Sequence, residues 1–214
     1  MTHWIFDLDG TLVDSFAHYF ETMGAIFGRY ERRFTPELHW ASLTEPVREF
    51  LARNLGDHAV PGALGELHER SNEDARWIRP FPGVVDILQT LSDRNARIGV
   101  WTSRDRISAQ LILDHSGLGK YVECLVTGSC VVERKPHPEG LVKVAGFFEC
   151  DPAEVTMVGD HEHDMMAARG VDAHALRASW HAYWPIERCA HADRQFFTTS
   201  ELAAWLSAPP PSGG

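Results

Sequence analysis

The sequence predicts an α/β fold: a parallel sheet covered by helices on both faces, with an all-helical segment inserted after the first strand. From residue 80 onward, short apolar segments alternate with amphipathic helical segments, and this alternation is typical of parallel sheets. Residues 15–79 instead show helical periodicity with no clear strand. The first strand is expected before them, at residues 4–6, so the helical segment interrupts the sheet and indicates a cap over its ligand-binding edge.

The rest of the chain is organised around residues 4–14, WIFDLDGTLVD. The apolar run stops at Asp7, Asp9 follows two residues later, and Gly10 lets the backbone turn. Carboxylates at the end of a buried strand lie at the edge of a parallel sheet where ligands bind. Aspartates are also common in capped loops, so this pair indicates a site only if partners follow downstream.

The inserted segment is expected to hold several helices, each bounded by residues that start or stop helices. Ser, Thr and Asp cap helix N-termini, proline is accepted in the first turn, and glycine ends a helix. The expected helices run from a cap at Asp14 or Ser15 to Gly28, from Thr35-Pro36, from Thr44-Glu45-Pro46 to Gly56, and over residues 62–77.

The remaining elements define the expected domains. Helices are predicted at residues 84–93, 107–117, 137–148 and 164–169, and strands at 96–101, 121–126, 155–158, 173–176 and 195–197. We therefore expect a core domain of residues 1–14 and 80–207, a helical cap domain of residues 15–79, and a flexible Pro/Gly/Ser-rich tail at 208–214.

The composition is that of an ordinary globular protein with a negative charge. The chain has 214 residues, 44% apolar and 23% charged, with a formal net charge of −10. This charge argues against nucleic acid as a partner, and a phosphate ligand would need a local metal, lysine or helix N-terminus. No apolar stretch approaches the ~20 residues of a membrane span, and no secretion signal is visible. We expect a cytoplasmic protein without a membrane partner, whose unpaired cysteines are reduced.

Thr102 and Ser103 follow the strand predicted at residues 96–101, where the next helix opens. The Thr102 hydroxyl and the following amides could hold a phosphate oxygen at that helix N-terminus. Thr102 could also simply cap the helix, with Asp105 completing a capping box. The two roles are compatible, so both stay open.

Lys135 lies in the sequence ERKPHP. The prolines on either side of His137 suppress helix formation and fix the loop. A fixed loop favours a positioned lysine, although a solvated surface lysine is the ordinary alternative.

A second set of acids follows the strand predicted at residues 155–158. Asp160 comes directly after a glycine, and Asp164 lies four residues further on, so both are expected on one face of the first helical turn. His161 and His163 between them could suggest zinc, but no cysteine lies near them in the sequence. A surface or supporting role is the favoured interpretation of the two histidines.

These acids would place up to four carboxylates, Asp7, Asp9, Asp160 and Asp164, against Lys135. Unit charges ~4 Å apart interact by about 4 kcal/mol at an effective dielectric near 20. Such a cluster calls for a divalent cation, and oxygen ligands that leave room for water and phosphate suit Mg²⁺.

In this order, the four stretches resemble motifs I to IV of the haloacid dehalogenase superfamily, most of whose members are phosphatases. The motif residues are the D-x-D-G-T-L-V-D string, Thr102, Lys135 in K-P-x-P, and the Asp160 and Asp164 pair, with His161 where relatives usually carry Ser or Thr. The resemblance covers nearly the whole chain and implies a Rossmann-like core with an inserted helical cap.

The resemblance also implies a role for each residue. Asp7 would be the nucleophile that forms an aspartyl-phosphate, and Asp9 the acid and then the base. Mg²⁺ would bind the Asp7 side chain, the Asp9 backbone carbonyl and Asp160, while Asp164 would orient water or Lys135. Phosphate-binding groups would be Thr102, Ser103 and Lys135.

The expected function is Mg²⁺-dependent hydrolysis of a small phosphorylated metabolite by a monomer or homodimer similar to phosphoglycolate phosphatases. Asp9 argues against a true haloacid dehalogenase, which lacks this acid. A mutase of the β-phosphoglucomutase type and a non-enzymatic binding relative stay as alternatives. Solvated helix faces explain the cap arginines that could contact a second anionic group: Arg29, Arg32, Arg33, Arg48 and Arg53. Packing or an interface explains the aromatic residues better than substrate recognition does: Trp40, Trp180, Tyr183 and Trp184.

Overall fold

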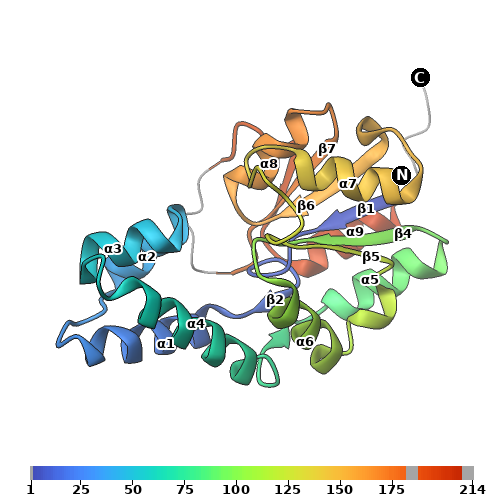
Figure 1. Ribbon diagram of the computed structural model, residues 1–214. Coiled ribbons are helices and arrows are strands. Elements are labelled where there is room, and N and C mark those ends of the chain that lie inside the picture. Colours follow the sequence, from blue (N-terminus) through green and yellow to red (C-terminus); the bar gives the residue numbers. More distant parts are fainter. Residues whose placement is uncertain (1, 182–187, 209–214) are drawn as a thin grey trace.

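The structure is a computed structural model that describes residues 2–181 and 188–208 (Figure 1). Tyr183 and Trp184 lie outside the described residues, as does nearly all of the predicted tail. Within the described ranges, no helix is both long enough and apolar enough to cross a bilayer. The four cysteines there are free thiols, as expected.

The described residues form a six-stranded sheet in which every pairing is parallel. This confirms the predicted α/β fold class. The sheet order is β5-β4-β1-β6-β7-β8, so the first strand lies in the middle. The strands are β1 (His3–Phe6), β4 (Arg97–Trp101), β5 (Cys124–Val126), β6 (Val155–Gly159), β7 (His174–Ala178) and β8 (Arg194–Phe196).

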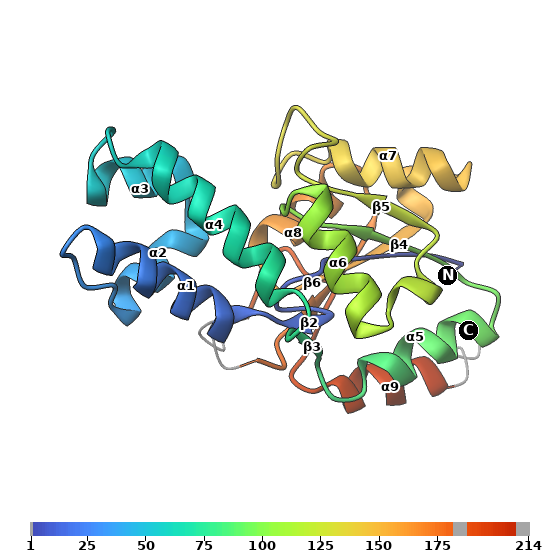
Figure 2. The ribbon, with the colours of Figure 1, turned by 60° about the horizontal axis from the view of Figure 1, so that its bottom comes forward.

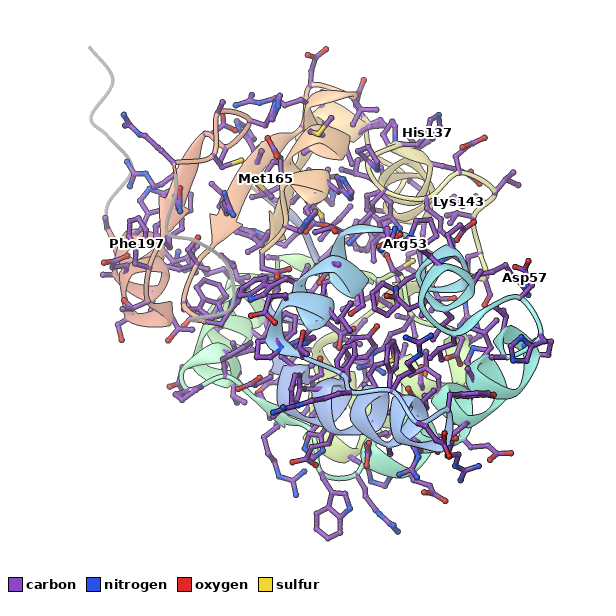
Figure 3. All side chains as sticks on the ribbon, turned by 90° about the vertical axis from the view of Figure 1, so that its left-hand side faces the viewer. Arg53, Asp57, His137, Lys143, Met165 and Phe197 are labelled. Atoms are coloured by element: carbon purple, nitrogen blue, oxygen red, sulfur yellow. The ribbon has the colours of Figure 1, made fainter. Side chains whose placement is uncertain are left out.

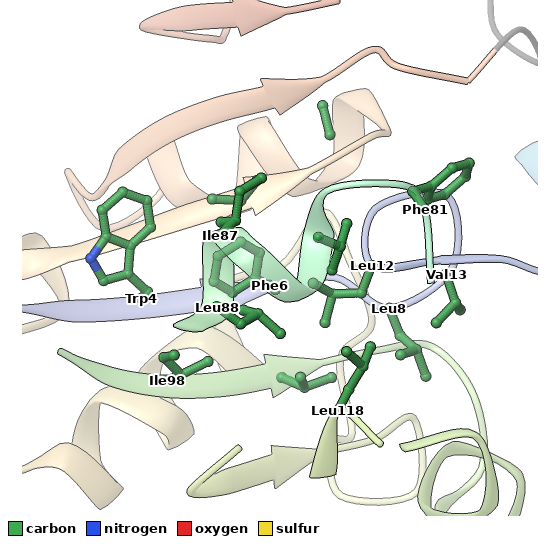
Figure 4. Packing of buried hydrophobic residues seen from close by; sticks show 14 of the residues in the cluster. Trp4, Phe6, Leu8, Leu12, Val13, Phe81, Ile87, Leu88, Ile98 and Leu118 are labelled. Carbon is green, nitrogen blue, oxygen red and sulfur yellow. The ribbon is translucent and has the colours of Figure 1, made fainter. Parts of the chain in front are cut away.

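Helices cover both faces of the sheet, and side chains alternate between the faces along β1. Trp4 and Phe6 pack with α5, α6 and α9, whereas Ile5 packs with α7 and α8 (Figure 4 shows the first cluster). The bounds are α5 (Val84–Asp93), α6 (Arg106–Ser116), α7 (Glu139–Phe148), α8 (Glu162–Arg169) and α9 (Thr199–Ser207).

The inserted segment is helical throughout and has its own apolar cluster. Its helices are α1 (Phe16–Arg29), α2 (Pro36–Thr44), α3 (Val47–Leu55) and α4 (Val60–Asp74), and they form a lobe beside the sheet (Figures 1 and 2). We refer to this lobe as the cap. Division of the chain into two domains at the predicted boundaries stays a prediction.

A short antiparallel pair lies where the chain enters and leaves the cap. Strand β2 (Val13–Asp14) pairs with β3 (Arg79–Pro80), with Asp14 opposite Arg79. This pair was not predicted, because two-residue strands have no periodicity. It brings the two connections of the cap together next to the site.

Several predicted element ends are wrong in detail. Thr35 caps α2 through the Leu38 amide as expected, but Thr44 is the last residue of α2, and α3 begins after Pro46 with no side-chain cap. Ser15 precedes α1 without capping it. The strand expected at 121–126 begins only at Cys124, because residues 119–121 form a 3₁₀ turn, and α9 was missed altogether.

Candidate active site

The carboxyl ends of the three central strands bring the predicted site residues together. In the parallel register, Phe6 of β1 lies opposite Val100 of β4 and Val158 of β6, so the residues that follow all reach one edge of the sheet. A cavity of about 210 Å³ opens there. Its lining includes every residue predicted for the site, Asp7, Asp9, Thr102, Ser103, Lys135, Asp160 and Asp164, together with Phe16, Leu43, His161 and His163.

Lys135 is a buried, paired lysine rather than a surface one. Its Nζ lies 2.6 Å from Asp7 Oδ1 and 2.6 Å from Asp164 Oδ1, and it donates a hydrogen bond to the Trp101 carbonyl at 2.9 Å. Burial alone would lower the pKa of Lys135, but the two carboxylates outweigh it and raise the pKa above its ordinary value. The ammonium therefore stays charged beside Asp7.

Lys135 does not balance the negative charge around Asp7. Burial raises the pKa of Asp7 well above its ordinary value; Lys135 opposes this, while Asp164, Asp160 and Asp9 raise the pKa further. Lys135 alone therefore does not keep the pKa of Asp7 low. A divalent cation at this position would supply the missing positive charge.

Asp160 is held against the loop that follows β1. A Cβ at Gly10 would lie 2.4 Å from Asp160 Oδ2, and Gly10 also has a positive φ of 76°, so only glycine fits there. Thr11 Oγ1 donates to Asp160 Oδ1 at 3.5 Å. The two acidic loops thus lie against each other, and Asp7 and Asp160 line the same cavity.

The donors present fit Mg²⁺ with an incomplete set of protein ligands. Within the part of the chain that the structure describes, no three His, Cys, Asp or Glu side chains form a ready metal cage. An ion between Asp7 and Asp160 would therefore complete its coordination shell with backbone oxygen, water or phosphate. Mg²⁺ typically keeps several waters in this way and binds few carboxylates.

Asp164 and His161 support the N-terminus of α8. The expectation that Asp160 and Asp164 share the first helical turn is wrong, because α8 begins at Glu162 with His161 as its N-cap. Asp164 Oδ2 accepts a hydrogen bond from the His161 amide at 3.1 Å, and His161 Nδ1 accepts one from the His163 amide at 3.2 Å. The His161 Nδ1 atom therefore binds the helix backbone, which agrees with the expected supporting role of this histidine.

His181 is a contact of the site that the sequence did not reveal. Its Nε2 lies 3.2 Å from Asp160 Oδ2, and its ring packs against Phe16 and Phe81. Its neighbour Trp180 donates to the Thr11 carbonyl at 3.1 Å and is partly buried against the core cluster, which agrees with a packing role. No local motif marks His181, because it reaches the site only through the path of the chain after β7.

Arg104 is the second residue that the sequence did not reveal. Its Nε donates to both oxygens of Asp9, at 2.9 and 2.7 Å, and its Nη2 donates to Asp9 Oδ1 at 2.7 Å. Ser15 Oγ donates to the same Oδ1. Burial opposes ionisation of Asp9, but Arg104 and Ser15 outweigh burial and lower the pKa of Asp9 below its ordinary value.

The loop that carries Arg104 differs from the expected cap arrangement. Asp105, not Thr102, is the N-cap of α6, and it accepts hydrogen bonds from the Ile107 and Ser108 amides at 2.9 and 3.0 Å. Thr102 is buried, and its Oγ1 accepts a hydrogen bond from the Arg104 amide at 3.2 Å. The Thr102 side chain therefore binds the loop of residues 102–104 and does not cap α6.

A larger cavity of about 680 Å³ lies between the cap and the core. It shares six lining residues with the smaller one, Asp9, Phe16, Leu43, Ser103, Lys135 and His163, so the two spaces are continuous. Arg104 and Arg134 line only the larger cavity.

The five cap arginines considered from the sequence are absent from the lining of both cavities. Arg29 pairs with Glu66 at 3.1 Å, and Arg53 pairs with Glu45 at 2.7 Å (Figure 3 labels Arg53). Their side chains are more than half exposed. The surface interpretation agrees with these positions.

The chain is similar to known proteins both in sequence and in fold. The chain is 26% identical over 183 residues to pyrophosphatase PpaX of Anoxybacillus flavithermus, covering 82% of each chain. It is 29% identical over 194 residues to phosphoglycolate phosphatase 1 of Pseudomonas aeruginosa, covering 85% of this chain and 71% of that one. Among solved structures, CbbY of Rhodobacter sphaeroides in complex with phosphate matches with a TM-score of 0.85 at 19% identity, covering 97% and 100%.

The family match covers all of the site described above except Trp180 and His181. Residues 4–178 match the haloacid dehalogenase-like hydrolase family, from the first residues of β1 to the end of β7. All seven residues predicted for the site, from Asp7 to Asp164, lie within that span. The chain therefore belongs to the haloacid dehalogenase-like hydrolase family.

Proposed function

We propose that this hydrolase is a Mg²⁺-dependent phosphatase that acts on a small phosphate monoester through an aspartyl-phosphate. The observation that carries the proposal is the pairing of Lys135 with both Asp7 and Asp164 at 2.6 Å in a cavity that also holds Asp9 and Asp160. Burial of such a charge cluster costs stability and is typical of a functional site. The phosphatase names of the similar proteins support the same reaction class.

In the proposed reaction, a carboxylate oxygen of Asp7 attacks phosphorus while Asp9 gives a proton to the leaving oxygen. Asp9 then takes a proton from the water that hydrolyses the aspartyl-phosphate. Lys135 and the Thr102 hydroxyl stabilise the charge on the transferring group. The metal, held by Asp7, Asp160 and the Asp9 carbonyl, would supply further positive charge for the phosphoryl oxygens.

The substrate is proposed to be small, with phosphoglycolate as the first compound to test. The cap and the core enclose the larger cavity, whose volume of about 680 Å³ suits a metabolite. A mutase of the β-phosphoglucomutase type would use the same four motif positions but return the phosphoryl group to the sugar. Product analysis with a hexose 1-phosphate separates the two, because a phosphatase releases inorganic phosphate and a mutase gives a hexose 6-phosphate.

The first prediction tests the metal together with the function. We expect hydrolysis of p-nitrophenyl phosphate in Mg²⁺, and its loss after exhaustive chelation. Replacing Asp160 with Ala should raise the Mg²⁺ concentration needed for half-maximal rate by more than about tenfold. The control is His161→Asn, which keeps an acceptor at the N-cap of α8 and should leave the requirement unchanged. Full activity without metal would contradict the mechanism, and no hydrolysis of any ester would favour a binding relative.

The second prediction concerns the cap. Since α1–α4 lie over the site, a large substrate cannot place its phosphate at Asp7 without displacing them. We expect kcat/KM for a folded phosphoprotein to be lower than for p-nitrophenyl phosphate by roughly 10²-fold or more. Comparable values would show that the cap does not restrict access.

A further inference from the structure

Arg104 binds the carboxylate of Asp9, which the proposed reaction needs for proton transfer. Three N–H···O contacts between 2.7 and 2.9 Å tie its guanidinium to both oxygens of Asp9. The Asp9 carboxylate cannot meet a leaving oxygen while both of its oxygens are held in this way. The pair therefore has to open before the reaction can begin.

Opening the pair is costly unless another anion takes the place of Asp9. The side chains of Arg104 and Asp9 are only 17% and 27% exposed, and a charge that loses its partner at such a site loses much more than a surface charge would. A carboxylate or phosphoryl group on the substrate offers the guanidinium an equivalent pair of acceptors. Exchange of one anion for another leaves the charge balance of the site intact.

Other acidic side chains of the larger cavity already have partners. Asp105 caps α6, Glu45 pairs with Arg53 at 2.7 Å, and Asp74 accepts a hydrogen bond from Thr22 at 3.1 Å. Among the described residues, no group accepts a hydrogen bond from Arg104 Nη1. The guanidinium thus keeps a free donor on the wall of the larger cavity.

The charge of the whole chain makes such a residue necessary for a doubly anionic substrate. With a formal net charge of −10, the protein repels anions at long range. Lys135 is already shared between two carboxylates, and Arg134 is exposed at the edge. Arg104 is a largely buried cation that lies next to the reacting carboxylates and also lines the larger cavity, where the rest of the substrate would lie.

We propose that Arg104 determines substrate specificity by binding a second anionic group of the substrate, a carboxylate or a phosphoryl group a short spacer from the phosphate, in exchange for Asp9. The inference rests on the proposed function and names the substrate class. The spacer must be short because Arg104 reaches Asp9, which is two residues from the nucleophile Asp7.

The experiment compares matched substrates. 2-Phosphoglycolate is paired with 2-hydroxyethyl phosphate, which has a hydroxymethyl group in place of the carboxylate, and pyrophosphate is paired with methyl phosphate. The kcat/KM ratio within each pair is measured for the wild type, Arg104→Gln and Arg104→Lys. Removing Arg104 also frees Asp9, but this affects both members of the 2-phosphoglycolate pair alike and cancels in their ratio. The leaving groups of pyrophosphate and methyl phosphate differ in their need for a proton, so binding to the inactive Asp7→Asn protein, with and without Arg104→Gln, decides that pair.

We expect Arg104→Gln to lower the ratio by roughly 10- to 100-fold in at least one pair, which is the value of a charged hydrogen-bonded contact. The pair affected tells whether the second group is a carboxylate or a phosphoryl group. Arg104→Lys should keep part of the preference, since it keeps the charge without the planar fork. The control is Arg33→Gln, an identical change of charge at an exposed position between α1 and α2, which should leave both ratios unchanged.

Unchanged ratios in Arg104→Gln, or equal changes in Arg33→Gln, would overturn the inference. Binding separates this failure from a failure of the proposed function. The same pairs are titrated by calorimetry in Mg²⁺ against Asp7→Asn and against Asp7→Asn combined with Arg104→Gln. If the wild type hydrolyses no ester, the proposed function fails, and the binding ratio still decides whether Arg104 recognises the second anion.

Discussion

Replacing Asp7 with Asn is expected to abolish turnover, with a loss of roughly four orders of magnitude or more, the scale on which loss of a nucleophile acts. Asparagine has the shape of aspartate but no carboxylate oxygen with which to attack phosphorus. Asp7 is buried at the end of β1 with Lys135 at 2.6 Å, so a neutral amide also removes one of the two anions that hold this lysine. The measurement is phosphate release from p-nitrophenyl phosphate in saturating Mg²⁺.

A second readout shows whether the loss comes from the nucleophile itself. After rapid quenching, intact-mass analysis should detect a phosphate adduct on the wild type and none on Asp7→Asn. The control is Asp164→Asn, which removes the other anion beside Lys135 but keeps the nucleophile; it should be slower yet still form the adduct. An adduct on Asp7→Asn, located by peptide mapping to another side chain, would show that Asp7 is not the nucleophile.

The centre of the site could be predicted because its residues follow the ends of apolar strands. Asp7, Thr102 and Asp160 each come directly after β1, β4 or β6, and parallel strands place their carboxyl ends at one edge. Because each residue follows a strand of the same parallel sheet, their closeness in space could be predicted from the sequence. Lys135 could be predicted from the prolines around it, although only the structure shows that it is buried between Asp7 and Asp164.

Arg104 and His181 could not be predicted because their partners are distant in sequence. Arg104 meets Asp9 across 95 positions, and His181 meets Asp160 across 21. In the sequence, Arg104 is one more basic residue at the start of a helix, where many arginines are solvated. Its significance depends on the direction of its side chain, which the structure shows to be toward Asp9.

The missed elements have a similar physical cause. Strands β2 and β3 have two residues each, too few to show a periodic pattern in the sequence, and their pairing joins segments far apart in the chain. Helix α9 did carry a local signal, since Thr198 accepts a hydrogen bond from the Glu201 amide at 3.1 Å ahead of the buried Leu202 and Leu206. Helix α9 has only nine residues, and a helix this short is marginal alone, so its stability depends on packing of Leu202 and Leu206 in the core.

Asp9→Asn is expected to separate proton transfer from nucleophilic attack. The variant keeps the shape of the loop and the nucleophile Asp7 but can neither protonate the leaving oxygen nor deprotonate water, steps worth typically ~10²–10⁴-fold each. Hydrolysis of an alkyl phosphate should fall by at least that factor. Acetyl phosphate has a leaving group that needs no proton, so it should still phosphorylate Asp7 in the variant. The aspartyl-phosphate should then accumulate, because its hydrolysis needs the missing base.

Asn at position 9 also breaks the ion pair with Arg104, and the choice of substrates removes this complication. A freed guanidinium affects alkyl and acyl phosphates together, whereas loss of the proton donor affects only the alkyl phosphate in the phosphorylation step. Quenched-flow mass measurement should therefore show rapid adduct formation from acetyl phosphate and slow formation from an alkyl phosphate. If both substrates slowed equally, Asp9 would act by positioning Arg104 or the metal and not by moving a proton.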